Sequence, residues 1–403
     1  MNSNDLFISL FKDYDNYREK NYNSDFISHS QLTELISVMQ TKNLFRVEKL
    51  GESIDGKEIF SIVFGKGETK ILAWTQMHGD EPTATAALFD LFNFFTSSDQ
   101  FDDLRKNLLG KITFHFIPML NPDGAEMYTR ENAFNIDLNR DALRLQSYES
   151  IILWDYAEKF EPEFCFNLHD QNSYYTSGRT NNASAISLLA PPMNHVKSIN
   201  YIREQSMQVI CRIKEVLSLF IPQNIARYKD DYEPRAFGDN FTKKGISTIL
   251  IESGYYKNDF KKDFIRKLNF IALLSAFNSI AEKGYENIDH KKYFDIPENE
   301  ELLFDLLLRN LILNYNGRKF KIDIGINREK KWNKESQSFY FKSKIADLGD
   351  LSTYYGIEEY DLTGYQVIPD NKLAVDEPAD MKIFFNGELS KKVSNGFITD
   401  LSK

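Results

Sequence analysis

The chain has few cysteines, two in 403 residues, so a scaffold held by several disulfides is excluded. Cys165 and Cys211 lie in an apolar strand-like run and a helix-like run, and we expect both to be buried free thiols. No stretch reaches the roughly 18 apolar residues that a membrane-spanning helix needs. Residues 1–20 lack the positive start and apolar core of a secretory signal, which favours a cytoplasmic location.

Positively charged residues are fewer than negatively charged ones. The chain carries 49 Lys and Arg against 59 Asp and Glu, which gives a net charge of −10 and a pI near 5.3. This balance argues against nucleic acid or an anionic membrane as the main partner. No Gly-x-Ser-x-Gly motif occurs, so a serine hydrolase of that type is excluded.

Apolar runs alternate with helical patterns through the first two thirds of the chain. This alternation predicts an α/β/α sandwich in which a mixed, mostly parallel sheet is covered by helices on both faces. The expected strands are 59–64, 70–76, 111–120, 163–168, 185–190 and 247–252, and the expected helices are 83–97, 147–160, 197–219 and 259–282.

The domain organisation follows from changes in this pattern. Residues 1–45 are expected to form a helical lead-in, 46–284 the main domain, and 285–403 a small β-rich C-terminal domain. Within the last of these, 301–313 has helical spacing before several strand-like runs. Between 318 and 344 there are nine Lys or Arg against three Asp or Glu, a pattern more typical of a solvated sheet face than of a site for an anionic partner. No oligomeric state is indicated.

Two of the six histidines stand at the ends of predicted strands. His78 and Glu81 follow one strand on a turn before a helix, and His169 ends another strand. Because ligands of open α/β sheets bind at the carboxyl ends of strands, these three side chains are expected to meet. Two His and one Glu are typical ligands of a single catalytic Zn²⁺, which keeps its fourth position for water. The alternative is that both histidines are ordinary loop residues.

The stretch between these ligands makes the pattern specific. The sequence resembles the M14 family of zinc carboxypeptidases, in particular its bacterial HGDE-type members, over roughly residues 45–282. The matching segments, in chain order, are GESIDGKEI at 51–59, HGDE at 78–81, NPDG at 121–124, Arg130, IDLNRD at 136–141, His169 and Glu252 in STILIESGY.

The resemblance implies a role for each matched residue. Asn139 and Arg140 would bind the free carboxylate at the substrate's C-terminus, for which the planar guanidinium is well suited. Arg130 would polarise the scissile carbonyl and stabilise its oxyanion. Asp137 would accept a hydrogen bond from a zinc-bound histidine. Glu252 would act as general base. The alternatives are a solvated surface pair for Arg130 and Arg140, and an ion pair with Lys243 or Lys244 for Glu252.

The specificity loop of the family precedes the general base. Tyr228 and Tyr232 both stand where its mobile tyrosine is expected, and the sequence does not choose between them. Arg235 is a hypothetical substrate-binding residue that would favour an acidic side chain on the terminal residue. Its alternative is local charge pairing with Asp230, Asp231, Glu233 or Asp239.

Two departures from the digestive enzymes, Asp80 and Asp170-Gln171, argue against digestive specificity and favour relatives that trim cell-wall peptides or amides. We therefore expect a zinc metallocarboxypeptidase that hydrolyses C-terminal peptide bonds, with acidic or murein-peptide ends as the finer hypothesis. A zinc deacylase acting on N-acyl amino acids or small amides is the first alternative, and a binding module without catalysis is the second. The presence of all three ligands and of Glu252 argues against the binding module.

Overall fold

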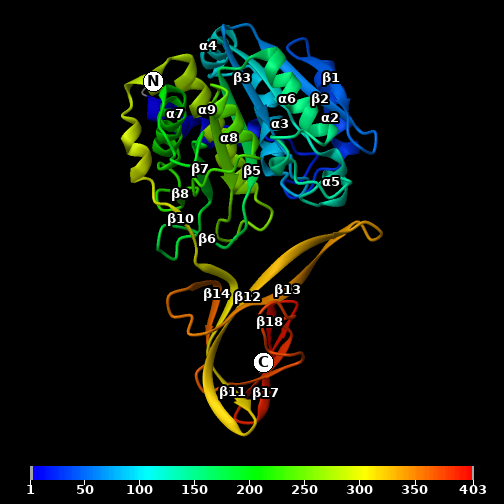
Figure 1. Cartoon of the computed structure of the whole chain (residues 1–403), viewed down its shortest axis with the longest axis vertical. Helices are drawn as coiled ribbons and strands as arrows, with labels where there is room; N and C mark the ends of the chain where they lie inside the picture. The colour runs from blue at the N-terminus through cyan, green and yellow to red at the C-terminus, as the bar shows by residue number, and fades with distance from the viewer. Residues whose placement is uncertain (1–2, 402–403) are drawn as a thin grey trace. The chain divides into compact units, whose positions relative to one another are not determined.

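The computed structural model describes residues 3–401, which form two compact units (Figure 1). The first unit comprises residues up to 172 together with 184–299. The second comprises 173–183 and the residues from 300 onward. The 3-10 helices η3 (Gly284–Asn287) and η4 (His290–Asp295) therefore belong to the first unit, although the sequence places its domain boundary at 285.

The first unit is built on an eight-stranded mixed sheet. Its central pairs are parallel, with β3 between β4 and β5 and with β9 beside β5, whereas β1 and β2 extend one edge in antiparallel fashion. On the other side β7 runs antiparallel to β9 and parallel to β8. In sheet order the strands are β1 (Arg46–Glu52), β2 (Glu58–Gly65), β4 (Ile112–Ile117), β3 (Thr69–Trp74), β5 (Phe164–Asp170), β9 (Ser247–Ser253), β7 (Ile186–Leu189) and β8 (Ile225–Arg227).

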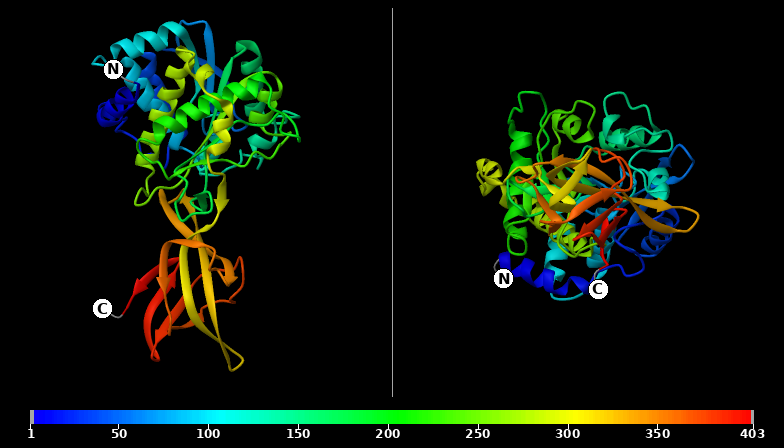
Figure 2. Two further views of the ribbon diagram at one scale, coloured as in Figure 1. Left: turned by 90° about the vertical axis from the view of Figure 1, so that its left-hand side faces the viewer. Right: turned by 90° about the horizontal axis from the view of Figure 1, so that it is seen from below.

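Helices cover both faces of this sheet (Figure 2), which confirms the predicted α/β/α sandwich. One face carries α1, α2, α3, α4, α7 and α9 in a large apolar core, and the other carries α6 and α8 in a smaller one. The helices are α1 (Ser3–Asp13), α2 (His29–Gln40), α3 (Thr83–Thr96), α4 (Asp102–Lys111), α5 (Pro122–Met127), α6 (Tyr148–Phe160), α7 (Tyr201–Leu217), α8 (Phe237–Lys243) and α9 (Asp263–Ala281), with the 3-10 turns η1 (Tyr14–Asn16) and η2 (Leu138–Arg140).

The alternation of side chains along β5 and β9 decides which face holds polar groups. Phe164, Phe166 and Leu168 join the large core, so Asn167 and His169 must point to the face of α6 and α8. In β9, Ile249 and Ile251 join the same large core, which leaves Glu252 on the face of His169. Both strands thus end with a polar side chain on one side of the sheet.

A buried charge network attaches the N-terminal segment to the core. Asp90 on α3 accepts hydrogen bonds from the Tyr14 hydroxyl at 2.7 Å, from the Glu19 backbone N–H at 2.7 Å and from Nε of Arg266 at 2.7 Å. Asp90 and Arg266 are both fully buried. Such a pair depends on both of its partners, because either charge alone is costly to keep away from water.

Asp90→Asn keeps the size of this side chain but leaves the buried Arg266 guanidinium without a countercharge. We expect it to lower the free energy of unfolding by about 3–5 kcal/mol, measured by urea denaturation. Glu282→Gln is the matched control, because Glu282 pairs with Lys111 at 2.8 Å but is half exposed, and about 1 kcal/mol or less is expected there. Equal losses in the two variants would contradict a structural role for the buried pair.

Among the described residues, one helix has the length and hydropathy of a membrane span, and it is α9. In the window that passes this test 83% of the residues are buried, as is usual for a central core helix. Cys165 and Cys211 are both buried free thiols, as predicted.

The second unit contains an eight-stranded sheet, which confirms the predicted β-rich domain. The predicted helix at 301–313 is wrong, because these residues form strand β11 (Leu303–Tyr315). The remaining strands are β12 (Arg318–Asn333), β13 (Ser338–Gly349), β14 (Tyr355–Asp361), β15 (Gln366–Pro369), β16 (Met381–Phe385), β17 (Glu388–Ser394) and β18 (Phe397–Asp400), and a separate two-stranded ribbon pairs β6 (Tyr175–Ser177) with β10 (Asn299–Glu301).

The leucines of β11 explain this error. Leu306, Leu308 and Leu311 lie in one apolar cluster, whereas Phe304 and Leu307 lie in another. A strand buried on both faces shows no alternation of apolar and polar residues, and its leucines then resemble a helical pattern. Pairing with β12, β14 and β15 outweighs the helical preference of leucine.

Candidate metal centre

The turn that presents His78 and Glu81 is held by the NPDG segment. Asn121 caps α5 by accepting a hydrogen bond from the Gly124 N–H at 2.9 Å, and its amide donates to the Met77 carbonyl at 3.3 Å. A Cβ at Gly79 would lie 1.9 Å from the Gly124 carbonyl carbon, so this close approach requires glycine. The HGDE and NPDG segments therefore support each other.

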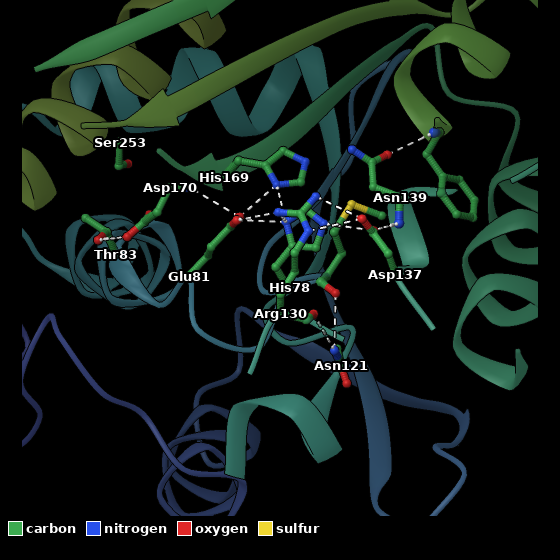
Figure 3. Close-up of polar contacts among 12 residues, drawn as sticks. His78, Glu81, Thr83, Asn121, Arg130, Asp137, Asn139, His169, Asp170 and Ser253 are labelled. Carbon is green, nitrogen blue, oxygen red and sulfur yellow. Dashed lines mark hydrogen bonds and ion pairs between the residues drawn. The ribbon is translucent and has the colours of Figure 1, made fainter. Parts of the chain in front are cut away.

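The three predicted ligands meet as expected (Figure 3). Nδ1 of His78 lies 2.8 Å from one oxygen of Glu81, and Nδ1 of His169 lies 2.8 Å from the other. The two Nδ1 atoms are 3.1 Å apart. All three side chains are buried, and their donor atoms lie within 4.8 Å of one another.

The charges of these groups are strongly linked. Burial raises the pKa of the Glu81 carboxyl, but the interactions with His78 and His169 lower it by more. The pKa of Glu81 is therefore well below its usual value. Burial lowers the pKa of His78, yet Glu81 and Asp137 outweigh burial and raise it to about 9. Glu81 is therefore ionised, and its carboxylate contacts an imidazole nitrogen of each histidine.

Asp137 and Arg130 form the surroundings of His78. An oxygen of Asp137 lies 3.1 Å from Nε2 of His78, the contact that fixes which ring nitrogen faces Glu81. Burial raises the pKa of Asp137, but His78 and Arg130 lower it to well below its usual range. Arg130 binds Asp137 through Nε at 3.0 Å, and its Nη1 lies 3.5 Å from Glu81. Arg130 is thus part of the site and not an isolated surface charge.

Glu252 stands beside His169, because the two residues are partners in the parallel register of β5 and β9. Its carboxyl is buried, and burial together with the nearby charge of Glu81 raises its pKa well above the usual value. Lys244, one of the two alternative partners, instead forms an ion pair with Glu158.

Asn139 and Arg140 lie on the turn η2. The side-chain oxygen of Asn139 accepts a hydrogen bond from the Phe237 N–H at 3.1 Å, which leaves the amide N–H₂ to point elsewhere. Arg140 donates from Nη1 to the Asn139 carbonyl at 2.8 Å, and its Nε lies 3.4 Å from Glu233. The Arg140 side chain is 39% exposed, so it can reach a ligand from solvent.

Arg235 forms a local ion pair, which is the alternative to substrate binding given in the sequence analysis. Its Nε and Nη2 bind the two oxygens of Glu233 at 2.9 and 2.8 Å. The backbone N–H of Tyr228 donates a hydrogen bond to the Leu188 carbonyl. Tyr232 lies in the segment before α8, and its ring contacts the ring of His195.

The structure adds residues that the sequence does not single out as functional. Lys262 donates to Asp170 and to the Ser253 carbonyl, each at 3.0 Å, and so joins the ends of β5 and β9 beside His169 and Glu252. Asn167 is fully buried on the face of His169, and its amide has no hydrogen-bond partner among the described residues. Asn167 could have been found from the sequence, because it is a polar residue in an otherwise apolar run and stands two residues before His169.

Comparisons with known proteins agree with this geometry. A family model described as zinc carboxypeptidase matches residues 32–210. Carboxypeptidase SOL1 of Arabidopsis thaliana is 32% identical over 24% of this chain and 21% of its own length. Carboxypeptidase M of Mus musculus is 29% identical over 27% of this chain and 28% of its own length. The matches thus span about a quarter of the length of these relatives.

A solved metallo-carboxypeptidase of Burkholderia cenocepacia shares the fold. It superposes with a TM-score of 0.52 at 17% identity, over 64% of this chain and 70% of its own. The first unit therefore has the fold of this structure, and residues 32–210 are similar in sequence to the zinc carboxypeptidase family.

Members of this family use zinc, and the residues present fit that ion. Two imidazole nitrogens and a carboxylate are the donors that Zn²⁺ prefers. The two Nδ1 atoms lie 3.1 Å apart beside the Glu81 carboxylate, so that all three donor groups converge on one place that a cation can occupy. His78, Glu81 and His169 are therefore the residues that would hold the ion.

Zinc-loaded protein should retain about one equivalent of zinc after dialysis, measured by elemental analysis. His169→Ala should lose most of this zinc, because it removes one of the three ligands. His290→Ala is the control, since His290 pairs with Glu204 and lies outside the cluster, and it should bind zinc as the wild type does. Equal zinc content in the two variants would contradict the assignment of the ligands.

Proposed function

We propose that this protein is a zinc-dependent carboxypeptidase that hydrolyses the C-terminal peptide bond of its substrates. The observation that carries the proposal is the register of His169 with Glu252, which sets a buried carboxylate beside the ligand cluster. A bound zinc ion polarises a carbonyl and lowers the pKa of water, so that water becomes a nucleophile near neutral pH.

The residues of the chain would then divide the work of the reaction. Glu252 would take the proton from the attacking water and deliver it to the leaving nitrogen, for which its raised pKa is suited. Arg130 would stabilise the negative charge that develops on the carbonyl oxygen. Asn139 and Arg140 would bind the terminal carboxylate and so set the scissile bond in place.

The finer parts of the proposal concern substrate and location. Peptides that end in a free carboxylate are the substrates we propose, and cell-wall peptides remain candidates. A preference for acidic ends has lost its main support, because Arg235 is engaged by Glu233. Tyr232 is favoured over Tyr228 as the mobile tyrosine, since Tyr228 is fastened to β7 by its backbone. A cytoplasmic location without nucleic-acid or membrane partners stays a prediction.

Glu252→Gln should lower kcat on a blocked dipeptide by about 10²–10⁴-fold, because the amide cannot accept the proton. Zinc content should stay unchanged. Glu158→Gln is the matched control, the same chemical change at a carboxylate that is 53% exposed and paired with Lys244. Activity of Glu252→Gln above about a tenth of that of the wild type would contradict its role as general base.

Arg140→Gln should raise KM for a substrate with a free terminal carboxylate by about 10–100-fold, because a charge-assisted hydrogen bond is lost. For the wild-type enzyme, amidation of that carboxylate should abolish most of the hydrolysis. Both are measured by steady-state kinetics on paired free and amidated peptides. Equal turnover of the two peptides by the wild type would contradict a carboxypeptidase, and turnover of acyl amino acids but not of longer peptides would favour the deacylase.

A further inference from the structure

Glu233 shares its carboxylate between two arginines. Arg235 binds both of its oxygens, through Nε at 2.9 Å and Nη2 at 2.8 Å. On the other side Nε of Arg140 lies 3.4 Å from Oε2. The Glu233 side chain is 27% exposed, against 54% for Arg235. The hydrogen bonds of Arg235 lower the pKa of the Glu233 carboxyl, so this group is anionic at neutral pH.

The backbone fixes this carboxylate where it is. The Arg235 N–H donates to Oε1 of Glu233 at 3.0 Å, and the Glu233 N–H donates to Asp239 at 3.1 Å. Two further bonds fasten the turn to the η2 region, from the Ala142 N–H to the Arg235 carbonyl at 3.0 Å and from the Phe237 N–H to Asn139 at 3.1 Å. Glu233 is therefore a built-in neighbour of the Asn139–Arg140 pair.

We propose that Glu233 is a specificity-determining residue, which lets the site accept the terminal carboxylate of a substrate but disfavours a second carboxylate on the last side chain. This inference rests on the proposed function, in which Asn139 and Arg140 hold the terminal carboxylate. Neutral or basic terminal residues are then the favoured class.

The argument is one of charge balance. Arg140, Arg235 and Glu233 together carry one net positive charge, which matches one incoming carboxylate. A guanidinium has two edges that can each bind both oxygens of a carboxylate. Glu233 occupies one of these edges in Arg235, the one formed by Nε and Nη2. A second carboxylate that approaches Arg235 would therefore meet the negative charge of Glu233, and like charges in contact oppose binding.

The test is equilibrium binding of N-acetylglutamine and N-acetylglutamate to the zinc-loaded full chain, measured by calorimetry. These ligands share one carboxylate and differ only in the second. The wild type should bind N-acetylglutamine more tightly. Glu233→Gln should shift the ratio of the two Kd values by about tenfold toward N-acetylglutamate, because Arg235 is released and the repulsion is removed. In Glu233→Gln/Arg235→Leu this shift should be smaller, because the repulsion is still removed but no released Arg235 can bind the second carboxylate.

Glu215→Gln is the matched control, since Glu215 pairs with Arg212 on α7 at 2.8 Å and its loss changes the net charge equally. Its ratio of Kd values should equal that of the wild type. If Glu233→Gln does not fold, Arg235→Gln is the second variant. It leaves the Glu233 charge free to compete for Arg140, and it should weaken both ligands by a similar factor of about three to ten.

A ratio in Glu233→Gln within about twofold of the wild type, tighter binding of N-acetylglutamate by the wild type, or no binding of either ligand at millimolar concentration would overturn the inference. Binding does not require turnover. Peptide hydrolysis that is absent while the ratio shifts as stated would therefore contradict only the proposed function, and intact hydrolysis with an unchanged ratio would contradict only the role of Glu233.

Discussion

The parallel order of β3, β5 and β9 is the constraint on which the rest of the site depends. Parallel neighbours end at the same edge of a sheet, so the residues that follow or close these strands share one small region. His78 comes after β3, His169 lies at the end of β5, and Glu252 lies at the end of β9. If these strands stood in another order, the predicted metal ligands would lie apart, even with the same residues at each strand end.

Glu81 converts this topology into a site, because its carboxylate touches both histidines. Further charged groups surround that carboxylate. Arg130 and Asp137 lie beside His78, and the pair Lys262–Asp170 closes the ends of β5 and β9. Each of these two pairs joins a cation to a carboxylate, which lowers the cost of keeping charged groups close together in a partly buried place.

Much of this arrangement could be predicted from the sequence. The strands that carry the site are apolar runs that end abruptly in a histidine or a glutamate, and such ends are visible without a structure. The apolar and polar periodicity also predicts the helices α3, α6, α7 and α9 to within a few residues. The meeting of His78, Glu81 and His169 follows from the strand ends once the sheet is known to be parallel.

What the sequence leaves open has physical reasons. Strand β11 is buried on both faces, so its leucines lack the alternation of an ordinary strand. The pairing of Arg235 with Glu233, and of Lys262 with Asp170, depends on how turns fold back, which local patterns do not encode. Residues 173–183 leave the first unit soon after His169, and only their pairing with later strands reveals this.

The central claim is that one divalent cation is held by His78, Glu81 and His169 with Glu252 facing it. Anomalous diffraction at the zinc absorption edge, on crystals of the zinc-loaded protein, tests this most directly. The account predicts one strong peak about 2.0–2.2 Å from Nδ1 of His78, Nδ1 of His169 and an oxygen of Glu81. A strongest peak at any other group of side chains, or a peak that leaves one of these three residues beyond bonding distance, would contradict it.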